Sequence, residues 1–248
     1  MPELKVTLLT HTPEPQKIMA AAAKLCYARA GIDTVMEGLT PEKTADFIDM
    51  LSGLGHESPM EHMTFSFGIE NVSRSLLAQI TRHRMASFSV QSQRYVAEKD
   101  FEFVTPPEIA GDEKAHGLYL QTMNDIAKAY NTLADALKER YINEGMDAKS
   151  AEKKAIEDAR YVLPNACTTK MIVTMNARSL HNFFKLRCCN RAQWEIRDLA
   201  CKMYDLVKEV APNVFEGAGP ACVRGGCSEG RMSCGKAAEV RKKFRGDK

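Results

Sequence analysis

The chain has 248 residues, of which 44% are hydrophobic and 27% are charged. This balance is ordinary for a folded protein and excludes an extensively disordered chain. Because 34 Lys and Arg residues face 32 Asp and Glu residues, the formal net charge is only +2, which excludes the broad positive field of a general nucleic-acid-binding protein.

The N-terminus and the cysteines indicate the cellular compartment of the protein. The first residues lack the basic and apolar regions of a secretory signal, and no apolar run approaches the length that spans a membrane. We therefore expect a cytoplasmic protein with no membrane partner, in which the eight cysteines are reduced.

Hydrophobic periodicity predicts both strands and helices in the first half of the chain. The expected elements are strands at 6–10 and 63–70 and helices at 15–29 and 41–54. Thr40 suits the N-cap of the second helix, because Pro41 follows it at the first helical position. A compact turn with His56 and His62 precedes the second strand. The spacing of these histidines fits no standard zinc pattern, so we interpret the segment as a polar turn near a functional site.

Longer helices are expected in the second half of the chain. The predicted elements are helices at 112–145, 148–161, 177–187 and 192–210 and a strand at 168–175. The apolar stripe of the first of these helices is Ile126, Tyr130, Leu133, Leu137 and Tyr141. Asn176 suits the N-cap of the helix at 177–187, whose Leu180, Phe183 and Phe184 would face the core. Arg160 ends its helix, where it caps carbonyl groups or faces a pocket; the sequence leaves both open.

The last part of the chain is rich in glycine and cysteine. Cys222, Cys227 and Cys234 lack the Cys-x2-Cys pair of common zinc sites, so we expect free thiols, although a metal with a fourth ligand from elsewhere stays open. Residues 236–248 carry many charges and are expected to be solvated. No Gly-rich phosphate loop is present, so any dinucleotide is not bound in the Rossmann manner. The whole pattern predicts an α/β (α+β) fold with a single domain, in which long helices flank a central mixed or antiparallel sheet.

A basic segment at residues 79–95 is the strongest functional signal. Arg82, His83, Arg84 and Arg94 stand close together with no Asp or Glu between them. Helical spacing predicts that Gln79, Arg82 and His83 share one face of a helix, which then runs into a loop rich in hydrogen-bond donors. Guanidinium groups bind phosphate bidentately, so we favour a phosphate site over simple complementation of a helix dipole.

The same segment resembles the signature of the flavin-dependent thymidylate synthases. That signature is Arg82-His83-Arg84, then seven residues, then Ser92, followed by Arg94-Tyr95. Further blocks of the same family, in its order, are similar to residues 55–62, the Gln79-x2-Arg82 spacing, Arg160 before 162–164, residues 176–183 and residues 186–196. The resemblance covers residues 4 to 215, so it implies a catalytic domain at 1–215 and a Gly- and Cys-containing basic tail at 216–248.

The resemblance implies an enzyme that methylates dUMP to dTMP. Methylenetetrahydrofolate would supply the carbon unit, and NADPH would supply the hydride through FAD. It also implies a homotetramer whose FAD sites are shared between subunits, with small-molecule substrates and no nucleic-acid partner. No metal is implied.

Site residues follow from the positions that match the family motifs. The implied FAD-binding residues are Ser58, Arg82, His83, Arg84, Val90, Asn176, Ala177, Arg178 and Asn182. The implied substrate-binding residues are Gln79, Arg82, Val90, Gln91, Ser92, Gln93, Arg94, Arg160 and Arg187. Val90 departs from the family, which often has Glu there, so it would contribute only through its backbone.

The implied chemistry suits these residue types. Arg187 matches the catalytic residue that stabilises the electron-rich pyrimidine ring, so that carbon C5 becomes nucleophilic. Arg94 and Arg160, with Ser92, would hold the monophosphate. An alternative role for Ser92 is that of an attacking nucleophile. The sequence shows no general base that would activate it, so we interpret Ser92 as a hydrogen-bond donor.

Two other functions stay open at this stage. A flavoprotein without synthase activity would keep the cofactor site but would not turn over dUMP. An RNA-binding module would use the basic segment, although the near-neutral charge and the single Trp argue against it.

Overall fold

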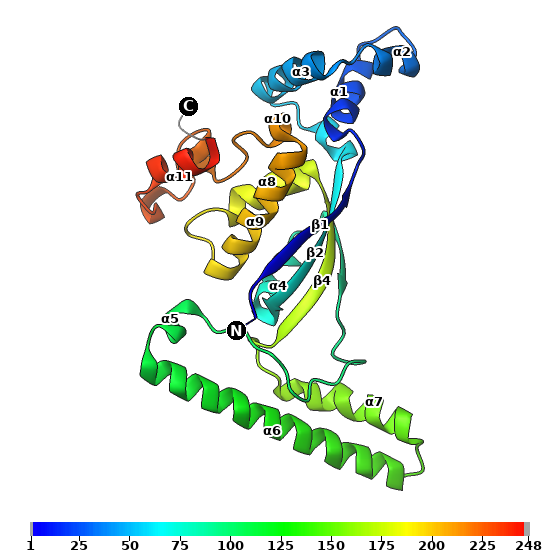
Figure 1. Ribbon diagram of the computed structural model, residues 1–248, viewed down its shortest axis with the longest axis vertical. Helices are drawn as coiled ribbons and strands as arrows, with labels where there is room; N and C mark the ends of the chain where they lie inside the picture. Colours follow the sequence, from blue (N-terminus) through cyan, green and yellow to red (C-terminus); the bar gives the residue numbers. More distant parts are fainter. Residues whose placement is uncertain (1, 246–248) are drawn as a thin grey trace. The chain divides into compact units, whose positions relative to one another are not determined.

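The computed structural model describes residues 2–245 as a mixed fold of helices and one antiparallel sheet (Figure 1). The sheet has four strands in the order β1-β2-β4-β3. Their bounds are β1 Lys5–His11, β2 Thr64–Ser73, β3 Ala86–Val90 and β4 Thr168–Asn176. The predicted α/β (α+β) fold class with a central sheet is confirmed. Within these residues, no helix is both long and apolar enough to cross a membrane.

Alternating side chains explain the two long strands. Phe65, Phe67 and Ile69 of β2 are fully buried, and the residues between them are less buried. The same alternation in β4 buries Met171 and Val173. Because successive side chains of a strand point to opposite faces, this pattern places these buried residues of each strand on one face.

The chain divides into two compact units, and the division passes through the strands. Unit 1 comprises the residues up to Lys5, Ile69–Ala78 and Ser89–Met171. Unit 2 comprises Val6–Gly68, Gln79–Phe88 and the residues from Ile172 onward. The proposed boundary at residue 215 stays a prediction.

A helical hairpin dominates unit 1. Its helices are α5 Pro107–Ala110, α6 Glu113–Asn143 and α7 Ala148–Ala159, followed by a 3₁₀ turn η2 at Arg160–Val162. Figure 1 shows α6 and α7 side by side. Tyr130 and Ala134 of α6 pack with Ile156 of α7. Leu133 was expected in the stripe but is 41% exposed, because Ala134 takes the contact position next to it and lets the helices approach.

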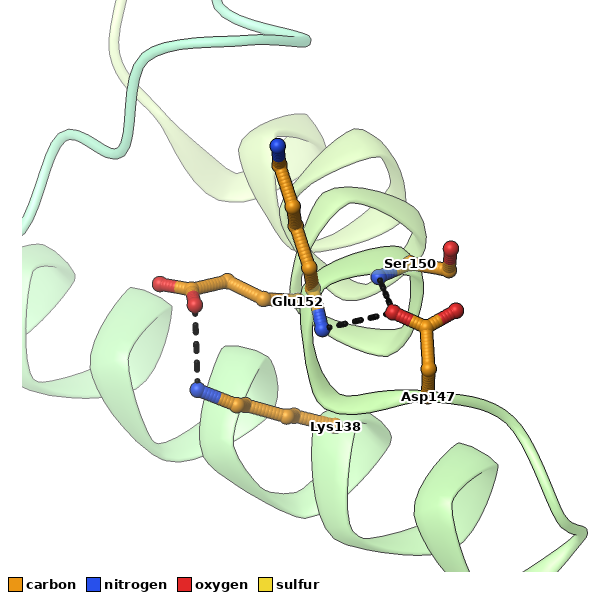
Figure 2. Close-up of polar contacts among 5 residues, drawn as sticks. Lys138, Asp147, Ser150 and Glu152 are labelled. Carbon is orange, nitrogen blue, oxygen red and sulfur yellow. Dashed lines mark hydrogen bonds and ion pairs between the residues drawn. The ribbon is translucent and has the colours of Figure 1, made fainter.

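Polar contacts fix the start of α7 (Figure 2). The Asp147 carboxylate accepts hydrogen bonds from the backbone amides of Lys149 and Ser150, both at 3.1 Å. Beside this cap, Lys138 of α6 and Glu152 of α7 form an ion pair at 3.1 Å. The N-cap satisfies amides that the first helical turn leaves without partners, so it determines where α7 begins.

Unit 2 holds most of the remaining helices. They are α1 Pro15–Leu25, α2 Ile32–Glu37, α3 Pro41–Leu54, α8 Ala177–Arg187, α9 Trp194–Val210, α10 Pro212–Phe215 and α11 Ala237–Arg245, with 3₁₀ turns η1 Ser58–His62, η3 Ala221–Val223 and η4 Gly230–Met232. The predicted bounds of α3 are confirmed, and the Thr40 hydroxyl accepts the Lys43 amide at 3.4 Å. By contrast, α1 is shorter than predicted and α2 was not predicted.

Aromatic side chains form much of the core of unit 2. Phe184 of α8 makes edge contacts with Tyr204 of α9 and Phe215 of α10, at centroid distances of 5.6 and 6.0 Å. Tyr204 also contacts Phe244 at 4.9 Å, and its hydroxyl donates to the Phe244 carbonyl at 3.2 Å. Phe244 is only 1% exposed. The expectation of a solvated end was therefore wrong for this residue, because α11 places its apolar face in the core.

Two distant segments of unit 2 join through a pair of amide side chains. Gln16 of α1 donates from Nε2 to the Asn213 Oδ1 of α10 at 3.3 Å. In return, the Asn213 backbone amide donates to the Gln16 Oε1 at 3.0 Å. The pair therefore connects the start of α1 to α10.

The basic segment departs from the prediction that Gln79, Arg82 and His83 share one face of a helix. The helix α4 spans Arg74–Ile80, and Arg82 and His83 lie in the turn that follows it. Their amides donate to the carbonyls of Gln79 and Ile80, at 3.3 and 3.0 Å. The segment expected to be a loop contains β3, a short strand whose polar alternation gave a weak signal.

Candidate functional site

A cavity of about 540 Å³ lies in unit 2, within the size range of small-molecule sites. The turn after α4 and the helix α8 supply nearly all of its lining. The lining residues are Glu61, Arg82, His83, Arg84, Met85, Asn176, Arg178, Ser179, Asn182, Leu186 and Arg187. Seven residues that the sequence assigned to ligand binding are therefore brought together: Arg82, His83, Arg84, Asn176, Arg178, Asn182 and Arg187.

His83 and Arg187 both line this cavity and contact each other. The Arg187 Nε donates to the His83 Nε2 at 3.1 Å, so this imidazole nitrogen accepts and the ring is neutral. Burial and the neighbouring Arg187 lower the pKa of His83. Phe183 holds the other side of the ring in an edge contact with centroids 4.9 Å apart. Burial, and then the charge of Arg82, lower the pKa of Arg187.

The N-terminus of α8 forms a second part of the cavity wall. The Asn176 Oδ1 accepts the Ser179 amide at 2.8 Å, which confirms the predicted N-cap. Arg178 and Asn182 are one helical turn apart, so they share a face of α8. A helix N-terminus carries partial positive charge, and a guanidinium beside it makes this wall suited to an anionic ligand.

Two carboxylates hold Arg178. Its NH1 donates to the Glu61 Oε1 at 2.5 Å, and its Nε lies 3.4 Å from the Glu57 Oε2. The hydrogen bond and the charge of Glu61, with Glu57, raise the pKa of Arg178. The expectation that the His56–His62 turn lies near the basic segment is confirmed, because Glu61 lines the same cavity as Arg82. Glu57 and Glu61 were not predicted as partners of Arg178, because the pairing joins segments far apart in the sequence.

Three expected site residues of unit 2 do not line this cavity. Ser58 is exposed at the start of η1. Ala177 is fully buried, and its amide donates to the Met63 carbonyl at 2.8 Å. Gln79 donates from Nε2 to the Gln193 Oε1 at 3.5 Å, so it is held by the N-cap residue of α9.

A separate basic cluster lies in unit 1. Arg94 forms an ion pair with the Glu157 carboxylate at 2.9 Å. Arg160 donates from Nε to the Glu157 carbonyl at 3.0 Å, so both guanidinium groups converge on one residue of α7. The Ser92 hydroxyl accepts the Arg94 amide at 3.2 Å, an interaction that shapes the turn rather than activating a nucleophile. The helix-capping interpretation of Arg160 is thus supported by its carbonyl contact.

The strand end before this cluster is anchored by Arg74, which the sequence did not single out. Arg74 donates to the Gln91 carbonyl at 3.0 Å, and the Gln91 amide donates to the Lys170 carbonyl at 3.0 Å. Gln93 donates from Nε2 to the Cys167 sulfur at 3.6 Å. Val90, the last residue of β3, precedes them and is partly buried. These backbone and side-chain contacts fix residues 90–93 and leave no direct sign of a ligand.

The chemistry of the unit 2 cavity is that of an anion site with a neutral imidazole. Arg82, Arg84, Arg178 and Arg187 give it four guanidinium groups against the single carboxylate of Glu61 in the lining. Such donors fit the phosphates of a dinucleotide and the oxygens of a flat heterocycle. Among residues 2–245, no three His, Cys, Asp or Glu side chains converge to hold a metal ion.

Comparison with known proteins identifies similar chains. The family model described as "Thymidylate synthase complementing protein" matches residues 7–213. A flavin-dependent thymidylate synthase of Clostridium tetani is 56% identical over 239 residues, covering 96% of each chain. One from Geobacter sulfurreducens is 49% identical over 244 residues, covering 98% of each chain. One from Pyrococcus furiosus is 35% identical over 251 residues, covering 97% of this chain and 96% of that protein.

Proposed function

Because this chain belongs to the thymidylate synthase complementing protein family, we propose that it methylates dUMP to dTMP with FAD held in the unit 2 cavity. It is an FAD-dependent thymidylate synthase, and its relatives are named flavin-dependent thymidylate synthases. The chemistry that bound FAD supplies is hydride transfer, with NADPH as the source of the hydride and methylenetetrahydrofolate as the carbon donor.

The residues of the cavity have proposed roles in holding the cofactor. Arg82, Arg84 and Arg178 bind its diphosphate, supported by the N-terminus of α8. Asn176, Asn182 and His83 donate or accept hydrogen bonds along the cofactor. Ser58, Val90 and Ala177 belong to the proposed cofactor set by their match to the family motifs alone, because they do not line the cavity.

Substrate binding is proposed for the remaining matched positions. Arg187 donates to the pyrimidine and stabilises its electron-rich form, while its Nε stays fixed on His83. Arg94 and Arg160, with Ser92, bind the monophosphate in place of part of their contact with Glu157. Gln79, Arg82, Gln91, Gln93 and the Val90 backbone complete the proposed substrate set.

The wider setting is proposed on the same basis. We infer a cytoplasmic homotetramer that shares its FAD sites between subunits, with small-molecule partners and no nucleic-acid partner. The near-neutral charge of +2 supports the absence of a nucleic-acid partner. We further propose that residues 1–215 form the catalytic domain and that residues 216–248 form its tail.

The observation that carries the proposal is the convergence of four guanidinium groups with the N-terminus of α8 around one cavity. The test is the visible absorption spectrum of the purified chain with added FAD, followed by anaerobic NADPH and then dUMP. We expect oxidised-flavin bands that NADPH bleaches, and dTMP when methylenetetrahydrofolate is present. A protein that takes up no FAD would refute the cofactor site, and FAD binding without dTMP would leave a flavoprotein of another activity.

Removal of Arg178 tests directly whether the cavity wall at the N-terminus of α8 binds the cofactor. We expect Arg178→Ala to weaken FAD binding by about tenfold to a hundredfold, because a charged hydrogen bond contributes about 1.5–3 kcal/mol. The matched control is Arg231→Ala, which removes an exposed guanidinium elsewhere in unit 2. Equal FAD affinity in the two variants, measured by fluorescence titration, would exclude Arg178 from the cofactor site.

A further inference from the structure

Two cysteines and a lysine meet in unit 2 outside the cavity lining. Cys188 is the C-cap residue of α8 and is 3% exposed. Cys201 lies in α9 and is partly exposed. Lys243 of α11 places its Nζ 3.3 Å from the Cys201 sulfur. Three helices therefore bring a cation and two thiols to one place.

The contacts at this place favour a thiolate on Cys201. The Cys188 thiol donates a hydrogen bond to the Cys201 sulfur. This bond, with the charge of Lys243, lowers the pKa of Cys201 to about 6 against the opposing effects of burial and Asp205. The same bond, with burial, raises the pKa of Cys188. The Cys201 sulfur is thus the nucleophile, and the Cys188 thiol keeps its proton.

We propose that Cys201 and Cys188 are a redox-sensitive dithiol, which low-molecular-weight disulfides such as oxidised glutathione convert to an intramolecular disulfide. Cys201 is the attacking residue because its sulfur contacts Lys243 and is partly exposed. Cys188 is the resolving residue because its buried thiol already contacts that sulfur.

The reaction balances in two steps of thiol–disulfide exchange. In the first step, the Cys201 thiolate bonds to one sulfur of the small disulfide and expels the other as a thiolate. In the second step, Cys188 gives its proton to that departing thiolate and attacks the Cys201 sulfur, which expels the second small thiolate. The two protein thiols are oxidised, and the small disulfide is reduced to two thiols.

Cys167, Cys222 and Cys26 have surroundings that differ from those of Cys201. Burial raises the pKa of the Cys167 thiol to about 11, which makes it a poor nucleophile. Burial, with the neighbouring Cys189, also raises the pKa of Cys222. Cys26 is exposed, and its sulfur contacts the Ala22 carbonyl at 3.6 Å.

Formation of the disulfide would act on the end of α8. Cys188 directly follows Arg187, whose Nε contacts His83 in the cavity. A covalent link from Cys188 to α9 restricts this end of the helix. The dithiol itself requires only the contacts among α8, α9 and α11, so its chemistry is independent of the proposed function.

The first test is the pH dependence of alkylation by iodoacetamide, followed for each cysteine by peptide mass spectrometry. We expect half-maximal reactivity of Cys201 at about pH 6, against about pH 8.5 for an unperturbed cysteine in a model peptide alkylated in parallel. Lys243→Met should move the Cys201 value upward, and Lys242→Met on the same helix should not. A Cys201 profile that matches the model peptide, or that is unchanged by Lys243→Met, would overturn the assignment.

The second test is titration with oxidised glutathione on the full chain with Cys189→Ser. This substitution removes the neighbouring thiol from the tryptic peptide 188–191, so a link from that peptide to peptide 198–202 identifies the Cys188–Cys201 disulfide. We expect loss of two hydrogens from the intact mass and restoration by dithiothreitol. A stable glutathione adduct on Cys201, or no modification, would contradict the resolving role of Cys188.

Discussion

His181 is an imidazole held inside unit 2 without a charge. Its Nε2 donates to the Val214 carbonyl at 3.0 Å, and its ring stacks on Phe215 with centroids 5.2 Å apart. Burial, and then the charge of Arg224, lower the pKa of His181 to about 4. The side chain therefore acts as a packed aromatic group with one fixed hydrogen bond.

The lowered pKa predicts acid sensitivity. An unfolded His binds a proton near pH 6.5, whereas folded His181 resists it until about pH 4, so stability falls as the pH drops through this window. The full loss from this residue is about 3 kcal/mol. The free energy of unfolding, measured by urea denaturation, should decrease less between pH 7 and pH 5 in His181→Asn than in the unsubstituted protein. The control is His56→Asn, which removes an imidazole at an exposed position.

At the scale of elements, the N-cap residues are the sequence features that best indicate where the helices begin. Thr40, Asp147 and Asn176 each accept a backbone amide at the start of a helix. These residues act within three positions of themselves, so the sequence predicted the caps at Thr40 and Asn176, although it did not single out Asp147. The strand β3 was missed because its pairing depends on a distant strand, and α4 ends early because the chain turns at Arg82.

Asn176 allows the cap of α8 to be separated from the cofactor site. Asn176→Ala removes the acceptor for the Ser179 amide and should cost about 1 kcal/mol of unfolding free energy. Asn176→Asp keeps an acceptor, so we expect nearly unchanged stability but weaker FAD binding, because a carboxylate would face the proposed phosphate site. Thermal unfolding and FAD titration give the two readouts. Equal stability of both variants would show that the cap contributes nothing.

At the scale of the whole molecule, most of the predicted cofactor set lies in unit 2, whereas the predicted substrate set is divided between the two units. The cofactor-type residues Arg82, Arg178 and Asn182 lie in unit 2, whereas Arg94 and Arg160 lie in unit 1. The sequence motifs identified the residues but not their partners. Glu61 is 117 positions from Arg178, and Glu157 is far from Arg94, so no local pattern could indicate these ion pairs.

The tail also contributes to the core of unit 2. Phe244 is 1% exposed and packs on Tyr204. We expect Phe244→Ala to lower the free energy of unfolding by about 3–5 kcal/mol, as large cavities in cores do. Met232→Ala is the control, since Met232 is 58% exposed in the same tail. Similar denaturation midpoints for both variants would mean that α11 is dispensable for folding.

The amide pair between Gln16 and Asn213 can form only late in the synthesis of the chain. The two residues are 197 positions apart, so α1 leaves the ribosome long before its partner exists. At about 5–20 residues per second, this wait is roughly 10–40 s. During this time the start of α1 lacks its contact with α10. Gln16 therefore gains its final hydrogen-bond partner only after Asn213 has left the ribosome.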